Sequence, residues 1–223
     1  LVIWLWGWRL WVQTGRPTAL LLVLVASTLL FYDNLRIGMG RFIGQGELLY
    51  ALSMPAFAWH WSMLPLLVIA AGAMARQAGL GWAKNRLVMG AFCVAAVLLS
   101  ALDIPSIFSM QLHPACLADT LRYSTRVTTA QLCPGSELII STGPGPLVAI
   151  LVNIVVLVVG IALWIQRDWP WLTVGAGLMF IAAGAFASSV WSLPIANFGE
   201  ICFTLGCIST AAHFARQDLQ RRL

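Results

Sequence analysis

Apolar runs long enough to cross a membrane recur along most of this 223-residue chain. A transmembrane helix needs ~20 mainly apolar residues, because the hydrocarbon core of a bilayer is ~30 Å thick. Only 9% of the residues are charged, too few to cover the water-facing surface of a soluble domain. Six runs have the required length, at 17–37, 54–75, 87–108, 146–166, 170–191 and 195–215. The sequence therefore predicts an all-α integral membrane protein, a bundle of about six transmembrane helices over 17–216.

Two shorter segments need separate treatment. In segment 1–16, Trp4, Trp8 and Trp11 share one helical face, which predicts an interfacial amphipathic helix. The end of an earlier span is the alternative, because the chain starts without Met. Segment 42–53 is apolar but short, so it is either an interfacial half-helix or part of a longer span kinked at Pro55 or Pro65.

The distribution of Lys and Arg predicts the orientation. Cytoplasmic loops of membrane proteins carry an excess of these residues. With the N-terminus inside, nine fall on the inner side and four on the outer: Arg9, Arg16, Arg76, Lys84, Arg86, Arg167, Arg216, Arg221 and Arg222 against Arg36, Arg41, Arg122 and Arg126. Both termini are predicted to be cytoplasmic, with 217–223 as a cytoplasmic tail. A bacterial inner membrane is the default location. Basic residues scattered singly at span ends give no reason to expect nucleic acid as a partner.

The longest loop, 109–145, contains Cys116 and Cys133. The charge rule places this loop on the extracytoplasmic side, where disulfides persist. A Cys116–Cys133 disulfide is therefore predicted, with two unpaired thiols as the alternative. The other cysteines fall within spans and are interpreted as small packing residues.

Ionisable and amide residues from separate spans fall at a similar depth. Counted from the inner-face Arg of each span, five of them lie roughly 14–17 residues away, or ~21–26 Å at 1.5 Å per residue: Asp33, His60, Asp103, Asn153 and Glu200. An ionisable side chain costs about 2.5–3.5 kcal/mol at the centre of a membrane helix. We therefore expect these groups to converge inside the bundle, supported by Glu47, Asn34 and Asn197 and with Arg36 and Arg41 as counter-charges.

The alternative is that each polar group is satisfied by itself. Outer-leaflet carboxylates can extend into the headgroups or cap helices. Asp103 precedes Pro105, which suggests a helix end, and Glu200 fits the first turn of a helix, where the dipole favours it. Under this interpretation no shared site exists.

A convergent layer suits several kinds of chemistry. Oxygen ligands with one imidazole favour a divalent metal, with Asp33, His60, Asp103 and Glu200 as ligands or catalytic groups. Neighbouring carboxylates also suit acid–base work on a lipid headgroup, or a proton relay. The Ala56–His60 spacing resembles the AxxxH pattern of bacterial light-harvesting polypeptides. That resemblance implies a tetrapyrrole at His60, which we favour less than a metal.

Two function classes follow. In the first, the protein handles a metal ion, protons or a lipid-like substrate at the polar layer near its extracytoplasmic face. In the second, it is a non-catalytic accessory subunit of a larger membrane complex, packing against lipids, pigment or other membrane subunits. The sequence leaves open whether it is an enzyme.

Overall fold

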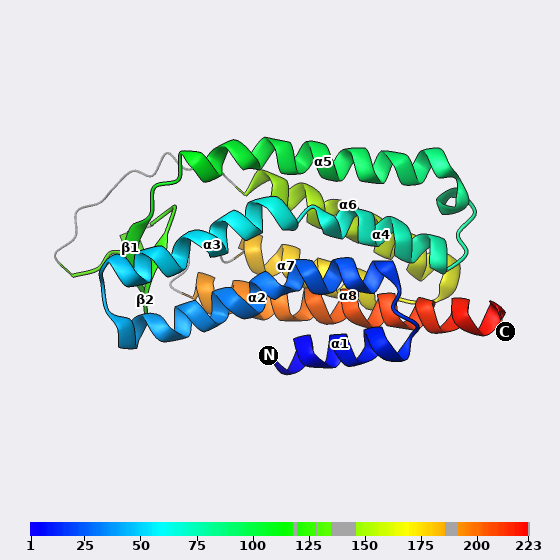
Figure 1. Ribbon diagram of the computed structural model, residues 1–223, viewed down its shortest axis with the longest axis horizontal. Helices are drawn as coiled ribbons and strands as arrows, with labels where there is room; N and C mark the ends of the chain where they lie inside the picture. The colour runs from blue at the N-terminus through cyan, green and yellow to red at the C-terminus, as the bar shows by residue number, and fades with distance from the viewer. Residues whose placement is uncertain (118–119, 128, 135–145, 186–190, 223) are drawn as a thin grey trace.

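The computed structural model describes residues 1–117, 120–127, 129–134, 146–185 and 191–222. Helices run along the long axis of the molecule, and a small β-hairpin lies at one end (Figure 1). The elements are α1 (Val2–Gln13), α2 (Thr18–Ile43), α3 (Glu47–Met63), α4 (Leu66–Gln77), η1 (Trp82–Lys84), α5 (Arg86–Phe108), β1 (His113–Leu117), β2 (Thr120–Ser124), η2 (Thr129–Gln131), α6 (Leu147–Arg167), α7 (Trp171–Ala185) and α8 (Ser192–Arg222).

Several helices match the length and composition of membrane spans. Four are long and apolar enough to cross a membrane: α2, α5, α6 and α8. The pair α3 and α4 makes a fifth if it counts as one span bent by 43°. The predicted span 170–191 corresponds to α7, a shorter apolar helix of 15 residues, and its last part falls outside the described residues. A helical membrane protein is thus supported, whereas the count of six spans is not confirmed.

The segment 42–53 does not form a separate half-helix. Residues up to Ile43 complete α2, and α3 begins at Glu47 and continues through Pro55 to Met63. The break falls at Leu64 and Pro65, before α4. Proline lacks the backbone N–H that a helix interior needs, so Pro65 fits the first position of a new helix. Of the two proposed kink sites, the structure uses Pro65.

The N-terminal helix α1 lies alongside α2 and α8, parallel to the long axis of the bundle (Figure 1). The indole Nε1 of Trp4 donates a hydrogen bond of 3.1 Å to the hydroxyl of Thr28 in α2, and Trp4 stacks on Phe31. Leu10 is buried in the main hydrophobic core. A helix lying in the membrane plane would cross the bundle axis, so this arrangement does not support the predicted interfacial helix.

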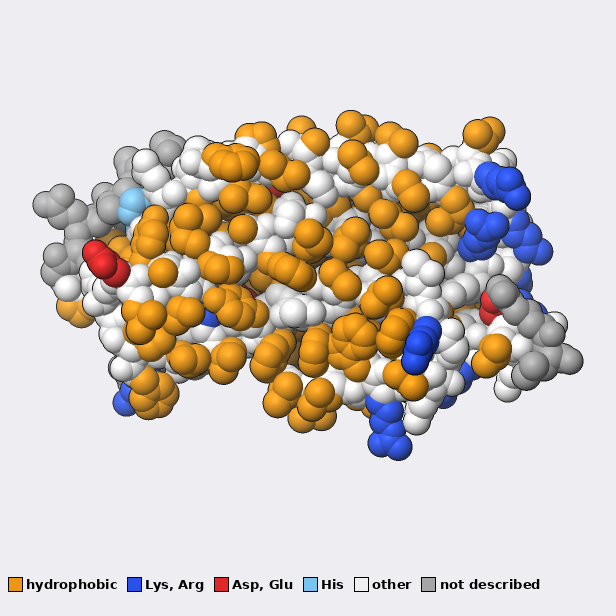
Figure 2. Space-filling view, viewed as in Figure 1, with side chains coloured by type: hydrophobic (Ala, Val, Ile, Leu, Met, Phe, Trp, Pro, Cys, Tyr) orange, Lys and Arg blue, Asp and Glu red, His pale blue; other side chains and the backbone are white. Residues whose placement is uncertain are grey.

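The two ends of the bundle differ in charge. Figure 2 shows Lys and Arg side chains gathered at the end opposite the hairpin. We call this the basic end. It comprises the connection from α4 to α5, the end of α6 and the last turns of α8. Its basic residues include Arg76, Lys84, Arg86, Arg167 and Arg221. We call the other the hairpin end. This separation agrees with the charge asymmetry expected from the sequence.

Helices α7 and α8 form the closest pair in the bundle. A Cβ atom at Gly175 would lie 2.7 Å from the carbonyl oxygen of Cys202, and one at Gly206 would lie 2.8 Å from that of Trp171. Only glycine allows the two backbones to approach this closely. By contrast, α5 buries Ala96 alone among its residues and exposes large apolar side chains along its length.

Candidate functional site at the hairpin end

A disulfide-linked hairpin covers the ends of α2 and α3. β1 and β2 pair antiparallel, with Ala115 opposite Arg122. Cys116 and Cys133 lie at disulfide distance, with their sulfur atoms 2.09 Å apart, as the sequence predicted. This covalent link joins the hairpin to the segment that follows it. Loop residues 118–119, 128 and 135–145 lie outside the described part of the chain.

The hairpin packs directly against the helices. A Cβ atom at Gly40 in α2 would overlap the carbonyl oxygen of Leu121. Tyr123 meets Tyr50 of α3 edge-on, with ring centroids 5.3 Å apart, and Leu49 is fully buried beside it. This second, smaller core fixes β2 over the last turns of α2.

Arg36 lies beneath the hairpin and is only 3% exposed. Its Nη2 and Nε atoms donate to Oδ1 of Asp33, at 2.5 and 3.1 Å. Its Nη1 atom donates to the hydroxyl of Ser53, at 2.9 Å, and to the carbonyl oxygen of Tyr123, at 3.1 Å. The guanidinium thus links α2, α3 and β2, and a buried charge of this kind needs such partners.

Asp33 is the centre of a wider charged group. Besides its ion pair with Arg36, its carboxylate lies within electrostatic range of side chains from three other elements: His60 in α3, Arg122 in β2 and Glu200 in α8. We call these five residues the Asp33 cluster. Three of them, Asp33, His60 and Glu200, belong to the layer expected from the sequence, so the structure brings this part of the layer together.

The other members of the predicted layer lie elsewhere. Asn153 donates a hydrogen bond of 3.2 Å to the carbonyl oxygen of Ala176, and so holds α6 against α7. Glu47 is exposed in the first turn of α3. Asp103 is half-buried in α5, and burial is the only effect found on its carboxyl group. These three residues do not join the Asp33 cluster.

The alternative of separate helix caps fails for two residues. Helix α5 continues past Asp103 and Pro105 to Phe108, so Asp103 does not mark a helix end. Helix α8 begins at Ser192, and Glu200 lies in its third turn rather than its first. The helix dipole stabilises a carboxylate in the first turn of a helix, and Glu200 lies beyond that turn.

The predicted metal set is not assembled in this arrangement. Within the described residues, no group of three or more His, Cys, Asp and Glu side chains is placed to hold a metal ion. Asp33, His60, Asp103 and Glu200 therefore do not form a shared coordination sphere here. The Asp33 carboxylate is engaged by a guanidinium, which competes with a cation for the same oxygen.

Sequence reasoning anticipates one arginine of the cluster and misses the other. The sequence predicts Arg36 as a counter-charge, and its place three residues after Asp33 on one helix is the spacing of the observed ion pair. Arg122 was counted only as a topology signal. Burial lowers the pKa of Arg122, an effect that the Asp33 carboxylate opposes and the Arg36 charge reinforces. Nothing in the local sequence marks Arg122, because hairpin pairing within the loop 109–145 places it here.

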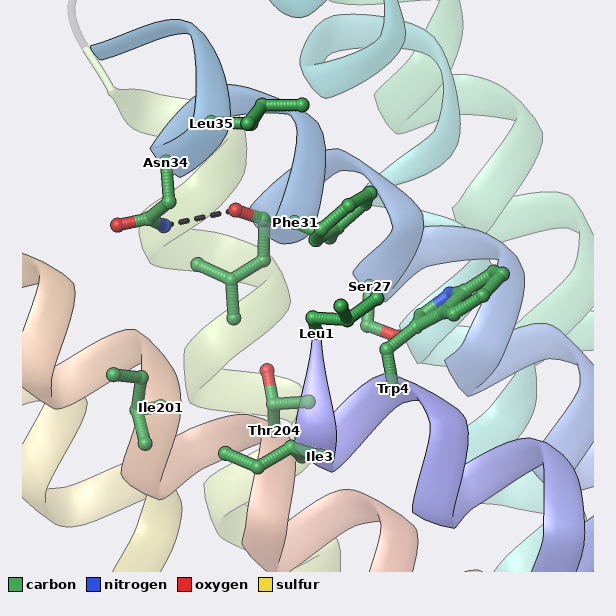
Figure 3. A pocket seen from close by; sticks show the side chains of 10 residues that line it. Leu1, Ile3, Trp4, Ser27, Phe31, Asn34, Leu35, Ile201 and Thr204 are labelled. Carbon is green, nitrogen blue, oxygen red and sulfur yellow. Dashed lines mark hydrogen bonds between the residues drawn. The ribbon is translucent and has the colours of Figure 1, made fainter. Parts of the chain in front are cut away.

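A hollow of about 370 Å³ lies between α1, α2 and α8 and is lined by Asn34 and Ile201, the chain neighbours of Asp33 and Glu200. Figure 3 shows its lining side chains facing one another from the three helices: Leu1, Ile3, Trp4, Ser27, Leu30, Phe31, Asn34, Leu35, Ile201 and Thr204. Asn34 donates to the carbonyl oxygen of Leu30 at 2.8 Å, and its Oδ1 accepts from Asn197 at 3.2 Å. The supporting amides Asn34 and Asn197 thus join α2 to α8 and satisfy each other, which leaves a mainly apolar hollow.

Comparisons with known proteins give no relative from which a function could be transferred. No protein-family model, no curated protein and no solved structure matches this chain. The function has to be argued from the Asp33 cluster and its surroundings.

Proposed function

We propose that this membrane protein handles protons on a lipid-like substrate, with Asp33, His60 and Glu200 as its acid–base groups. The observation that carries the proposal is the electrostatic link of His60 and Glu200 to the same carboxylate, from two further helices. Isolated ionisable groups are costly at membrane depth, so groups that meet one another there mark functional sites. Arg36 fixes the Asp33 carboxylate, while His60 and Glu200 exchange protons with the substrate.

The adjacent hollow supports a substrate with a hydrocarbon part. Asp33 and Asn34 are neighbours in α2, and Glu200 and Ile201 are neighbours in α8, so the cluster and the hollow share the same turns of two helices. Its volume of about 370 Å³ falls within the ~300–1,000 Å³ range of small-molecule pockets. An acyl chain in the hollow would place its polar end beside the cluster.

The orientation forms part of the same proposal. The basic end is assigned to the cytoplasm and the hairpin end to the extracytoplasmic side of a bacterial inner membrane. The disulfide at the hairpin end supports this assignment, since disulfides persist in oxidising compartments.

The experiment compares the lipids of nanodiscs that contain the full chain before and after incubation, by mass spectrometry. Wild type is expected to convert one lipid class, and Glu200→Gln and His60→Gln are expected to lose at least ~100-fold of that rate, as general acid–base groups do. Glu47→Gln is the matched control, because Glu47 is exposed and outside the cluster. Equal conversion by Glu200→Gln and wild type, or none by wild type, would contradict the proposal.

A second function is favoured by α5. Its nearly complete exposure of apolar side chains suits contact with lipid or with another membrane subunit, as an accessory subunit of a larger complex would need. Co-purification of a stoichiometric partner that Leu98→Trp on α5 disrupts, together with unchanged behaviour of Glu200→Gln, would favour that function. A Soret band in the purified protein would point to the tetrapyrrole variant of it.

A further inference from the structure

The two arginines of the Asp33 cluster differ in how their donors are used. Arg36 makes four hydrogen bonds, to Asp33, Ser53 and Tyr123. The Nε atom of Arg122 is buried and, among the described residues, has no hydrogen-bond partner. The donors of Arg36 are therefore used to link α2, α3 and β2, whereas the buried Nε donor of Arg122 is unused.

An unused guanidinium donor in a buried position is unfavourable. Buried polar groups are nearly always hydrogen-bonded, and leaving one unsatisfied costs about 1–3 kcal/mol, more when it is charged. The Asp33 carboxylate interacts with Arg122 electrostatically but is already bonded to Arg36. The Nε donor of Arg122 thus lacks a partner, and an anionic acceptor would satisfy it.

The depth of Arg122 indicates the kind of anion. Helix α2 has 26 residues, so it is ~39 Å long and exceeds the ~30 Å hydrocarbon core of a bilayer. A helix of this length reaches beyond the hydrocarbon core into the headgroup region, where phosphate groups are the common anions, and its last turns lie under β2. The planar guanidinium also matches phosphate oxygens in a bidentate manner.

We propose that Arg122 is a binding residue for a phosphate group, carried to the Asp33 cluster by the disulfide-linked hairpin. This inference rests on the proposed function, because it assigns the headgroup class of the substrate at that site. Arg122 binds the phosphate through its guanidinium, whose Nε donor is unused. Arg36 remains engaged with Asp33, and the hydrocarbon chain of the ligand occupies the neighbouring hollow.

The test measures binding of phosphatidic acid and of diacylglycerol to the full-length protein by native mass spectrometry. Arg122→Gln is expected to weaken phosphatidic acid binding about 10- to 100-fold, the value of a hydrogen bond to a charged group, and to leave diacylglycerol binding unchanged. Arg122→Lys is expected to fall between the two. Arg126→Gln is the matched control, since Arg126 is exposed just beyond β2.

Inorganic phosphate serves as a competitor that distinguishes the source of the anion. Competition at millimolar concentration assigns the site to phosphate in general, and resistance to it assigns the site to a lipid headgroup. Either result supports phosphate recognition if it depends on Arg122. Equal phosphatidic acid binding by Arg122→Gln and wild type would overturn the inference, as would no preference of wild type for phosphatidic acid over diacylglycerol.

Two further measurements keep the result interpretable. If Arg122→Gln does not fold, protection of Arg122 in the wild-type protein from phenylglyoxal by phosphatidic acid replaces it, and lack of protection counts against the inference. Glu200→Gln is expected to bind phosphatidic acid like wild type while it loses lipid conversion. If Glu200→Gln loses lipid conversion but Arg122→Gln binds phosphatidic acid like wild type, the proposed function is supported and only the inference about Arg122 is contradicted.

Discussion

Arg167 and Arg36 lie near opposite ends of the bundle and have different kinds of partner. At the basic end, Arg167 donates to three main-chain carbonyl oxygens, of Ala78 at 2.7 Å, Gly79 at 3.0 Å and Gln166 at 3.0 Å, and is itself exposed. At the hairpin end, Arg36 is buried and bonded to a carboxylate. Exposed charges are solvated whether or not they have partners, while buried charges depend on them. An unmatched donor on a buried arginine is therefore informative, whereas one on an exposed arginine is not.

The largest effect is expected from Asp33→Ala. This change leaves the buried Arg36 guanidinium without its carboxylate, which costs about 3–5 kcal/mol when one partner of a buried ion pair is removed. Thermal unfolding in detergent, followed by circular dichroism, measures the loss. The double variant Asp33→Asn with Arg36→Met is expected to recover part of the stability. A wild-type melting curve for Asp33→Ala would contradict the conclusion that the buried Arg36 depends on the Asp33 carboxylate.

Loss of the disulfide is expected to have the next largest effect. Cys116 and Cys133 are 17 residues apart, and closing a loop of ~15 residues is worth about 3 kcal/mol in the chain-entropy description. In Cys116→Ser with Cys133→Ser, limited proteolysis is expected to cut the hairpin faster than in wild type. Cys93→Ser, at an exposed free cysteine, is the control. Equal cleavage rates for wild type and the double variant would show that packing alone holds the hairpin.

A smaller effect is expected from Gly40→Ala. The added methyl group would overlap the carbonyl oxygen of Leu121 and push β2 away from α2, at about 1–3 kcal/mol for overpacking. Gly38→Ala is the matched control two residues earlier, where nothing lies within 4 Å, and it is expected to be neutral or slightly stabilising. Thermal unfolding compares the stability of the two variants. Equal stability would contradict the close contact between β2 and α2 at Gly40.

The smallest effect is expected from Arg167→Gln at the basic end. Three hydrogen bonds to carbonyl oxygens are lost, one of them partly buried and two exposed, and water replaces them, so the cost should be about 1 kcal/mol or less. The same unfolding assay applies. A loss as large as that of Asp33→Ala would mean that the two ends do not differ in how they depend on charge.

The helices could be predicted from sequence because the membrane imposes their length and composition. The bounds of α2, α5 and α6 agree with the predicted runs to within a few residues at most ends, and α2 extends further at its C-terminal end. The orientation of α1 was not predictable, because a face of tryptophans suits a headgroup layer and a helix groove equally well. Trp4 uses its polar edge to bond Thr28 rather than water.

The candidate site was predicted in part for a related reason. Depth counting relies on rise along a helix, so it identified Asp33, His60 and Glu200 as neighbours in height. It gives no information on rotation about the helix axis, so it does not distinguish Asn153, which bonds Ala176 in α7, from the members of the cluster. It also gives no information on loops. Arg122 reaches the cluster through strand pairing, which cannot be predicted from the periodicity of helices.

The glycine contacts between α7 and α8 have a consequence for motion. Helices whose backbones touch cannot easily slide or rotate against each other without a clash of main-chain atoms, so we expect α7 and α8 to move together as one body. Glu200 belongs to that body and Asp33 does not. A shear of the α7–α8 body past α2 would therefore change the separation of these two carboxylates directly.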